Sequence, residues 1–151
     1  MERAARLRLD DQLCFAMYAA SNAIVRAYRP LLSEIGLTYP QYLVMMVLWE
    51  RDDQSVSDIA ERLLLPPHAL SPLLDRMSRS GILTRQRDPH DGRVVRVRLT
   101  RAGTRLHDGA SRVAASVACR TQLTTVATDA IRGQLQDFVR VMEQRPDLVP
   151  T

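Results

Sequence analysis

The sequence predicts a mainly α-helical protein of the α+β class, with one small β-hairpin set among its helices. Two observations predict this class. Apolar residues recur every three to four positions through most of the 151 residues, which is the period of an amphipathic helix. Apolar and polar residues alternate in two short stretches, "ILTRQR" and "RVVRVRLT", and "DPHDG" between them is turn-forming. At this length one compact unit is the default expectation.

A long N-terminal helix is predicted over residues 10–34. Apolar side chains recur there at helical spacing, from Leu9 and Leu13 onward, until Gly36 and Pro40 interrupt the pattern. A second helix, "PQYLVMMVLWER", starts with Pro40 at its first position and is apolar around most of its circumference. We therefore expect the second helix to be the buried core helix.

Two short helices are predicted next. "SVSDIAERLLL" begins with a serine ahead of an acidic first turn, which is a helix-start signal. In "HALSPLLDRMSRSG" four apolar side chains form one stripe: Leu70, Leu73, Leu74 and Met77. Because Pro72 removes a helical hydrogen bond, we expect this helix to begin late, near Ala69, or to kink at the proline, and Gly81 ends it. Two short helices joined by a tight turn, the second of them basic, are the parts of a helix-turn-helix.

The hairpin directly after these helices is a wing, so residues 40–100 are predicted to form a winged helix-turn-helix. From "TRAGTRLHDG" the helical pattern returns and runs to about Gln144, with a break near "TTVATDA". Residues 1–39 and 101–151 are therefore predicted to be helical dimerisation regions, because their apolar faces need a partner. Arms at both ends of the sequence suggest an intertwined homodimer, which would place two recognition helices on double-stranded DNA.

The distribution of charge supports a nucleic-acid partner. All 21 basic residues are arginine, and the formal net charge is +4. Nine arginines and two aspartates lie between Arg76 and Arg105, which leaves seven net positive charges there. This is the footprint of a polyanion-binding face, and a solvated basic surface without a partner is the alternative.

Seven residues of the second short helix and the wing are candidate DNA contacts: His68, Ser71, Arg76, Arg79, Arg87, Arg93 and Arg96. Arginine can bind guanine through two hydrogen bonds, and Arg93 at the wing tip can enter a minor groove. A purely structural ion pair is the alternative role for Arg93. We expect Asp88 and Asp91 to brace the hairpin, because carboxylates so near DNA are otherwise unfavourable.

Other classes of protein are not supported by the sequence. No run of 18 apolar residues occurs and the first residues are charged, so we expect neither a membrane span nor a signal peptide, and a cytoplasmic location. Three histidines and two cysteines that are 105 positions apart provide no zinc-ligand cluster. We expect no metal, no cofactor and no catalytic residues.

The two cysteines can be read in two ways. Inert packing is the default for a free cysteine, and it applies to both Cys14 and Cys119. Cys14, however, lies in the first turns of its helix, where the helix dipole favours a thiolate. Tyr18 follows one turn later on the same face and either joins a thiolate network or merely packs. Tyr28 and Tyr39 are further phenol donors nearby in the sequence.

The stretch "LDDQLCFAMYAASNAIVRAYRPLLSEIGLTYPQYLVMMVLWE" resembles the N-terminal third of the OhrR group, the organic-hydroperoxide-sensing branch of the MarR family of winged helix-turn-helix repressors. "LSPLLDRM" and "GILTRQRDPHDGRVVRVRLT" resemble the recognition helix and wing of that family. The most specific elements are the cysteine in "DDQLCFA", "YRPLL" and "LTYPQY". The resemblance implies that Cys14 is the peroxidatic cysteine and that Arg93 is the minor-groove arginine. It also implies that Tyr28 and Tyr39, of the same subunit or its partner, hydrogen-bond the thiolate.

The family has a one-cysteine type and a two-cysteine type, which carries a resolving cysteine in its penultimate long helix. Cys119 falls in that helix, so the resemblance implies a disulfide between oxidised Cys14 and Cys119 of the other subunit. The expected function is a homodimeric repressor that releases its operator when an organic hydroperoxide oxidises Cys14. Four apolar residues are expected to surround Cys14 and to favour organic hydroperoxides: Phe15, Met17, Leu31 and Leu32.

Two departures from the family pattern concern DNA binding. Relatives commonly have "LDSGTL" where this chain has "LPPHAL", which places His68 in the turn, and Gly92 stands where a larger residue is common. Two alternatives to the redox repressor stay open. One is a MarR-type repressor that is released by a small aromatic ligand. The other is a thiol peroxidase, against which stands the absence of a thioredoxin-like βαβ pattern.

Overall fold

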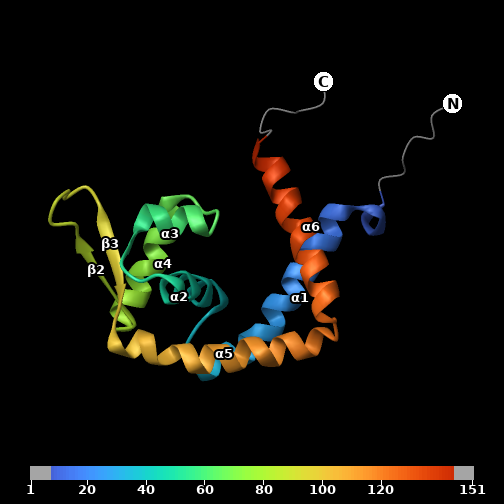
Figure 1. The fold of residues 1–151 in the computed structure, drawn as a ribbon, viewed down its shortest axis with the longest axis horizontal. Helices are drawn as coiled ribbons and strands as arrows, with labels where there is room; N and C mark the ends of the chain where they lie inside the picture. Colours follow the sequence, from blue (N-terminus) through green and yellow to red (C-terminus); the bar gives the residue numbers. More distant parts are fainter. Residues whose placement is uncertain (1–7, 145–151) are drawn as a thin grey trace. The chain divides into compact units, whose positions relative to one another are not determined.

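The computed structural model describes residues 8–144, which fall into two compact units that divide between Ala115 and Ser116. Both units are mainly helical, and the first also holds a small sheet (Figure 1). Its elements are η1 (Leu9–Asp11), α1 (Leu13–Glu34), α2 (Tyr39–Glu50), β1 (Gln54–Ser55), α3 (Val56–Arg62), α4 (Pro67–Arg79), β2 (Leu83–Arg87), β3 (Val95–Leu99) and the larger part of α5 (Arg101–Thr121). The second unit contains the end of α5 and helix α6 (Thr125–Gln144). The predicted fold class, a mainly helical protein with a winged helix-turn-helix, is confirmed.

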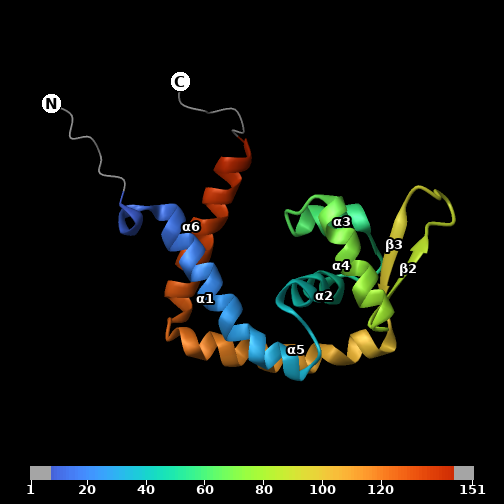
Figure 2. The same ribbon diagram turned by 180° about the vertical axis from the view of Figure 1, so that it is seen from behind.

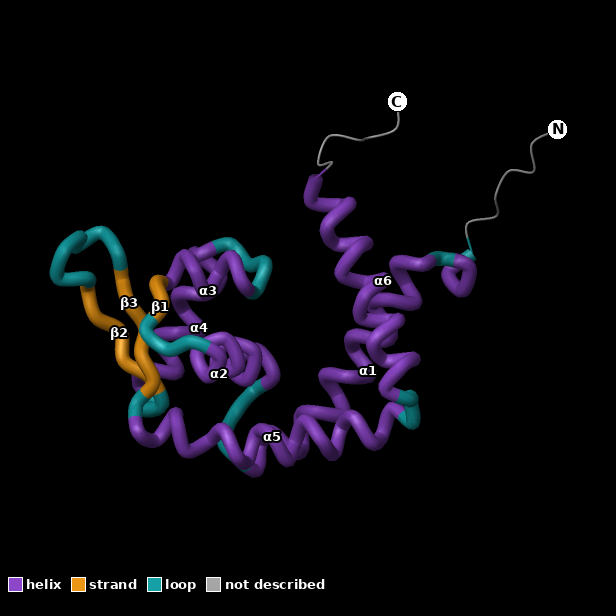
Figure 3. The backbone as a smooth tube through the Cα atoms, viewed as in Figure 1, coloured by secondary structure: helices purple, strands orange, loops and turns teal. Residues whose placement is uncertain are grey.

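The sheet has three antiparallel strands in the order β1-β3-β2. Strands β2 and β3 form the predicted hairpin, with Leu83 opposite Leu99 and Arg87 opposite Val95. Figure 3 shows β1 beside β3, on the side of β3 that is away from β2, and next to α3. The sequence did not predict β1, because a strand of two residues is too short for an alternating pattern.

Helix α1 is buried only near its C-terminal end. It begins at Leu13 rather than at residue 10, because Leu9–Asp11 form a separate turn of 3-10 helix. Leu32 is completely buried, whereas Leu13 is 62% exposed and Ile24 is 43% exposed. The N-terminal part of α1 stands clear of α2, α3 and α4 in both views (Figures 1 and 2). This part of the helix therefore presents apolar side chains that the first unit itself does not cover.

Helix α2 is the core helix, as its sequence predicts. Five of its twelve residues are buried: Tyr42, Val44, Met45, Val47 and Leu48. Its start is fixed by a capping box in which the Gln41 backbone N–H donates to the Thr38 side chain and the Thr38 N–H donates to the Gln41 side chain. Pro40 is the second residue of the helix, not the first.

Helices α3 and α4 form the helix-turn-helix. Ser55 caps α3, with Asp58 completing a second capping box. The four residues of the predicted stripe in α4 are all buried, and burial of each contributes roughly 1.5–3 kcal/mol. The helix begins at Pro67, two residues before Ala69, so Pro72 lies inside it. Gly81, with φ +77°, follows the end of α4 in the left-handed conformation that glycine favours.

The start of α5 lies very close to the end of the turn after α4. A Cβ atom on Gly103 would lie 2.0 Å from the carbonyl oxygen of Ile82, so only glycine permits this approach. The indole of Trp49 in α2 donates a hydrogen bond to the Gly103 carbonyl at 3.1 Å. The predicted break in the C-terminal helical region is confirmed between Thr121 and Thr125.

Of the helices within residues 8–144, none is by itself long and apolar enough to cross a membrane. Only α1 and α2 taken together reach that length and composition, and they are bent by 76° at the break between them.

Candidate nucleic-acid interface and redox site

The outer face of α4 carries four of the predicted DNA contacts. His68 is exposed at the second position of the helix, and Ser71 follows, half-buried. Arg76 and Arg79 are exposed in the last turns. The expectation that His68 lies in the preceding turn was wrong, because proline at the first helical position starts α4 at Pro67. His68 is therefore located in the first turn of the second helix of the helix-turn-helix, and helix-turn-helix proteins contact base edges from that turn.

An ion pair connects α4 to the wing through Arg85, which was not among the predicted site residues. The Arg85 guanidinium in β2 donates to the Asp75 carboxylate and, at 3.2 Å, to the Ser71 hydroxyl. Its side chain is 20% exposed, and its Nε is buried without a partner among the described residues. Because the Ser71 oxygen accepts from Arg85, its own O–H is left to donate elsewhere. Arg85 lies two positions after the buried Leu83, so the alternation of β2 puts both side chains on the face of the strand that is turned toward the core. That alternation is the sequence signal that could have identified Arg85 as an internal contact.

The wing turn is held by its two aspartates. Asp88 accepts hydrogen bonds from the backbone N–H groups of His90 (2.8 Å) and Asp91 (3.2 Å), and these bonds, against some desolvation, lower the pKa of Asp88. Asp91 accepts from the Arg93 side chain and backbone N–H, which lowers the pKa of Asp91. Arg87 donates to the Gly92 carbonyl at 2.6 Å. Both carboxylates therefore stay ionised near neutral pH.

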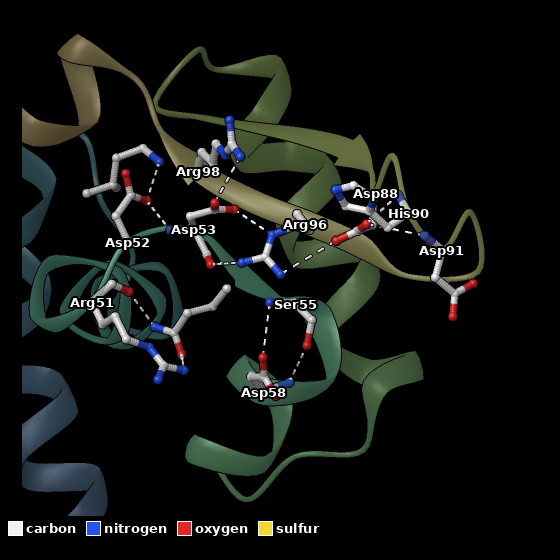
Figure 4. Close-up of polar contacts among 12 residues, drawn as sticks. Arg51, Asp52, Asp53, Ser55, Asp58, Asp88, His90, Asp91, Arg96 and Arg98 are labelled. Atoms are coloured by element: carbon white, nitrogen blue, oxygen red, sulfur yellow. Dashed lines mark hydrogen bonds and ion pairs between the residues drawn. The ribbon is translucent and has the colours of Figure 1, made fainter.

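The two wing arginines differ in their exposure. The Arg93 side chain is 92% exposed at the tip of the wing, although it contacts Asp91. The Arg96 side chain is 31% exposed, and its Nε lies 2.7 Å from Asp53 (Figure 4). Asp53 was not predicted, because it lies 43 residues away in the sequence. Arg93 is thus available at the surface, whereas Arg96 is largely engaged within the protein.

The two cysteines are both exposed free thiols in the single chain. Cys14 is the second residue of α1, as expected from its place near a helix start. Cys119 is near the end of α5 and belongs to the second compact unit. Tyr18, one turn after Cys14, is 66% exposed. Inert packing within the chain therefore does not account for either thiol.

Tyr28, Tyr39 and Tyr42 form a compact cluster between α1 and α2. Their ring centroids are 5.2 to 6.1 Å apart. Burial, the proximity of Tyr42 and a hydrogen bond to Tyr42 raise the pKa of Tyr28 to about 12, and burial also raises the pKa of Tyr39. These phenols therefore stay protonated and can act as hydrogen-bond donors. Tyr42 was missed in the sequence, because its place in the core helix indicated only packing.

The tyrosine cluster is far from Cys14 of the same chain. Cys14 and Tyr28 are fourteen residues apart in one helix, which at 1.5 Å per residue separates them by about 21 Å. Leu31 and Leu32 lie further along, and Leu32 is completely buried in the core. Leu31 and Leu32 therefore do not surround Cys14 of their own chain, and their place beside Cys14 of a partner subunit stays a prediction.

A cavity of about 260 Å³ opens between α2 and the part of α5 in the first unit. It is lined by Tyr42, Met46, Trp49, Glu50, His107, Ala110, Ser111 and Ala114. The rings of Trp49 and His107 meet edge to face with centroids 5.4 Å apart. The cavity therefore combines aromatic walls with a few polar groups, as small-molecule sites do.

Comparison with known proteins places this geometry in a family. The family model for MarR matches residues 37–95. The chain is 32% identical over 139 residues to the organic hydroperoxide resistance transcriptional regulator of Bacillus subtilis, covering 92% of this chain and 95% of that protein. The chain belongs to the MarR family. It is also 54% identical over 95 residues to the HTH-type transcriptional regulator TtmR of Methylorubrum extorquens, covering 63% of this chain but only 49% of TtmR, about half its length.

Solved structures of MarR-type regulators agree with the fold. Reduced AbfR bound to DNA matches with a TM-score of 0.77 and 30% identity, over 89% of this chain and 94% of that chain. AbfR comes from Staphylococcus epidermidis, and its disulfide-formed structure matches with a TM-score of 0.63 and 29% identity, over 91% of each chain. As a MarR-family member, this chain is a DNA-binding transcriptional regulator. Its relatives are named regulators and not enzymes, which argues against the thiol peroxidase alternative.

Proposed function

We propose that the chain is a homodimeric repressor that releases operator DNA when an organic hydroperoxide oxidises Cys14. The observation that carries this proposal is an exposed thiol at the second position of α1, in a chain that aligns almost end to end with an organic hydroperoxide resistance regulator. The thiolate is the form of cysteine that attacks peroxides, and an exposed thiol is accessible to them. On this proposal the regulator is cytoplasmic, where its thiols are kept reduced until the signal arrives.

Dimerisation is supported by apolar side chains on both helical arms. Leu13 and Ile24 of α1 are exposed, and Ile131, Leu135 and Val141 of α6 are between 43% and 56% exposed. Contiguous exposed apolar surface is rare on monomers and marks interaction sites. A second copy of the chain would cover these residues and would present two recognition helices to two half-sites of operator DNA.

A dimer would also account for the distance between the thiol and the tyrosines. About 21 Å of helix separate Cys14 from Tyr28 of its own chain, which no side chain can span. The phenols of Tyr28 and Tyr39 therefore serve Cys14 of the partner subunit in this proposal. Because their pKa values are raised, both phenols stay neutral, and in this proposal Tyr28 exchanges its hydrogen bond to Tyr42 for one to the thiolate. Tyr18, one turn from Cys14 and exposed, is the remaining candidate for the same network.

The chemistry proceeds in two balanced steps. The Cys14 thiolate attacks one oxygen of the hydroperoxide, an S–O bond forms as the O–O bond breaks, and the alkoxide leaves as an alcohol after taking up a proton. Cys14 is oxidised to the sulfenic acid and the hydroperoxide is reduced. The Cys119 thiol of the partner then attacks the Cys14 sulfur, an S–S bond forms as the S–O bond breaks, and the departing hydroxide takes up the thiol proton and leaves as water.

DNA contact is assigned to the outer face of α4 and to the wing. His68 and Ser71 can reach base edges, and exposed arginines can reach bases or phosphates: Arg76, Arg79, Arg87 and Arg93. In this proposal the two Cα atoms move to within about 4.4–6.8 Å of each other to form the disulfide, and that movement changes the separation or tilt of the two recognition helices. DNA binding would then fail at one or both half-sites.

The proposal is tested with wild type, Cys14→Ser and Cys119→Ser after one equivalent of cumene hydroperoxide. Non-reducing electrophoresis reports the crosslink, and DNA binding is measured on the same samples with a duplex that the reduced wild type has selected from a random pool. We expect a covalent dimer and loss of binding in wild type, and neither in Cys14→Ser. If oxidation releases the DNA without a crosslink, and release requires Cys14 but not Cys119, then Cys119 serves packing and not the switch. Continued release from Cys14→Ser would overturn the sensor.

The cavity between α2 and α5 favours a second candidate, a repressor that is released by a small aromatic ligand. Its lining includes Tyr42, Trp49 and His107, and its volume of about 260 Å³, just below the roughly 300–1,000 Å³ of most small-molecule sites, leaves room only for a small ligand. The Cys14→Ser variant distinguishes the two, because a ligand-gated repressor would still release DNA when phenolic compounds are titrated into it.

A further inference from the structure

The turn between α2 and β1 is held in an uncommon conformation. Asp53 has φ +56°, in the left-handed region that few non-glycine residues adopt, although aspartate tolerates it better than most. The Asp52 carboxylate accepts hydrogen bonds from the backbone N–H groups of Asp53 at 2.8 Å and Leu99 at 2.9 Å. Gln54, only 6% exposed, donates from its side chain to the carbonyl of Val47 at 3.0 Å. The turn is therefore fixed both to α2 and to β3.

Asp53 uses this conformation to bind two arginines of β3 (Figure 4). The Arg96 Nε donates to one carboxylate oxygen at 2.7 Å, and an Arg98 Nη donates to the other at 2.9 Å. A second nitrogen of Arg96 donates to the Asp53 backbone carbonyl. These charged hydrogen bonds outweigh desolvation and lower the pKa of Asp53 to about 2, so the carboxylate is ionised throughout the physiological range.

The contacts continue from Arg96 to the tip of the wing. A further nitrogen of Arg96 lies 3.8 Å from the Asp88 carboxylate, which is 18% exposed. Asp88 holds the backbone of His90 and Asp91, and Asp91 in turn contacts Arg93. Figure 4 shows Asp53, Arg96, Asp88 and Asp91 in one line along β3 and into the wing turn. An unbroken series of ion pairs and hydrogen bonds thus runs from the end of α2 to the exposed wing arginine.

We propose that Asp53 is a positioning residue for DNA recognition, which fixes the direction of the wing through Arg96 and Asp88. This inference rests on the proposed role of the wing in DNA contact. It gives Arg96 a different role from direct contact, because its guanidinium binds two carboxylates within the protein. Asp53 also neutralises one of the two positive charges of Arg96 and Arg98, which lowers their non-specific attraction for DNA.

The experiment compares full-length wild type, Asp53→Asn and the control Asp129→Asn, in each case as the reduced protein. Asparagine keeps the shape of the side chain and tolerates the left-handed conformation, so the charge and one of the two acceptor oxygens are removed without a change of backbone. Asp129 forms an exposed ion pair with Arg132 in α6, so its variant loses the same charge and one Asp–Arg pair away from the wing. The probes are a duplex of about three helical turns that wild type has selected from a random pool and an unrelated duplex of equal length.

We expect Asp53→Asn to lose roughly fivefold or more in the ratio of affinities for the selected and the unrelated duplex, with Asp129→Asn unchanged. Hydrogen exchange in residues 88–93 of the free protein should accelerate in Asp53→Asn while exchange in α4 stays the same. Unchanged discrimination, or an equal loss on both duplexes, overturns the role of Asp53. Failure of wild type to enrich any duplex would instead overturn the wing interface itself.

Arg96→Gln separates positioning from direct contact. Loss of a phosphate contact lowers the slope of log affinity against log salt by about 0.9, whereas loss of positioning leaves that slope unchanged and lowers discrimination. If Asp53→Asn fails to fold, Arg96→Gln also serves as the second variant, because it removes the contacts of Arg96 with both Asp53 and Asp88. Faster exchange in residues 88–93 of Arg96→Gln supports the proposal, and wild-type exchange and discrimination overturn it.

Discussion

The guanidinium of Arg85 in β2 is paired with the carboxylate of Asp75 in α4, so the wing and the recognition helix are joined directly by charge. Arg85 also donates to Ser71 in the same helix. The two elements that we assign to DNA contact are therefore connected to each other inside the protein as well as through the chain.

Replacement of Arg85 by Gln should lower the free energy of unfolding by about 1–3 kcal/mol, because Asp75 and Ser71 lose a charged donor in a half-buried site. Urea denaturation measures this loss. Arg62→Gln is the matched control, since its pair with Glu50 is 63% exposed on both sides and should contribute less than about 0.5 kcal/mol. Equal losses in the two variants would contradict the structural importance of Arg85.

Replacement of Arg93 by Ala should weaken binding to the selected duplex and lower the salt slope by about 0.9, because one exposed positive charge leaves the DNA interface. Binding is measured by fluorescence anisotropy between about 50 and 200 mM salt, a range over which such slopes are resolved. Arg132→Ala in α6 serves as the control for loss of one arginine. A salt slope equal to that of wild type would show that Arg93 serves only its ion pair with Asp91.

Mixed dimers should show that Tyr28 acts on the thiol of the partner subunit. When a wild-type chain is paired with a chain that carries both Cys14→Ser and Tyr28→Phe, the dimer has one Cys14 thiol, in the wild-type chain. The partner of that thiol lacks the phenol at position 28. We expect this thiol to react more slowly with cumene hydroperoxide, as followed by stopped-flow trapping of the sulfenic acid.

The reciprocal dimer, with Cys14→Ser in one chain and Tyr28→Phe in the other, is the control. Its single Cys14 thiol faces an intact Tyr28 across the interface and should react at the wild-type rate. The opposite order of rates would place the tyrosine and the thiol in the same subunit, against the roughly 21 Å of helix between them.

The Asp53 ion pairs should make stability fall in acid. The pKa of Asp53 is about 2 in the folded protein and 3.8 ordinarily, so its contribution is present above about pH 4 and is lost as the pH falls toward 2. The free energy of unfolding of wild type should therefore decline more steeply between about pH 4 and pH 2 than that of Asp53→Asn. Parallel curves for the two proteins would contradict the lowered pKa.

Local patterns predicted most of the fold. The buried stripe from Leu70 to Met77 follows from helical spacing, and the cap at Ser55 follows from one serine placed before an acidic turn. The two strands of the wing follow from alternation. In contrast, β1 has two residues, and its existence depends on pairing with β3, for which no local pattern exists.

The candidate site was predicted less completely than the fold, because the residues that were missed are recognised only by their contacts with residues far away in the sequence. Asp53 and Arg96 meet across 43 residues, and Arg85 reaches Ser71 across 14. Tyr42 lies in a helix whose composition indicated only a core. The residues that were predicted, such as Cys14 and Arg93, stand out through residue type, through their place at a helix start or in the wing turn, and through the family resemblance.

In helix α1 a small displacement at the N-terminal end corresponds to a rotation of the helix near the core. Cys14 lies sixteen residues before Pro30, about 24 Å along the axis, and Pro30 removes one backbone hydrogen bond just where the helix enters the core. For a rod of that length, a displacement of about 5 Å at Cys14 corresponds to a rotation of roughly 12° at its base. If the proposed disulfide forms at Cys14, the length of the helix therefore converts a displacement there into a rotation at the tyrosine cluster and the core helix.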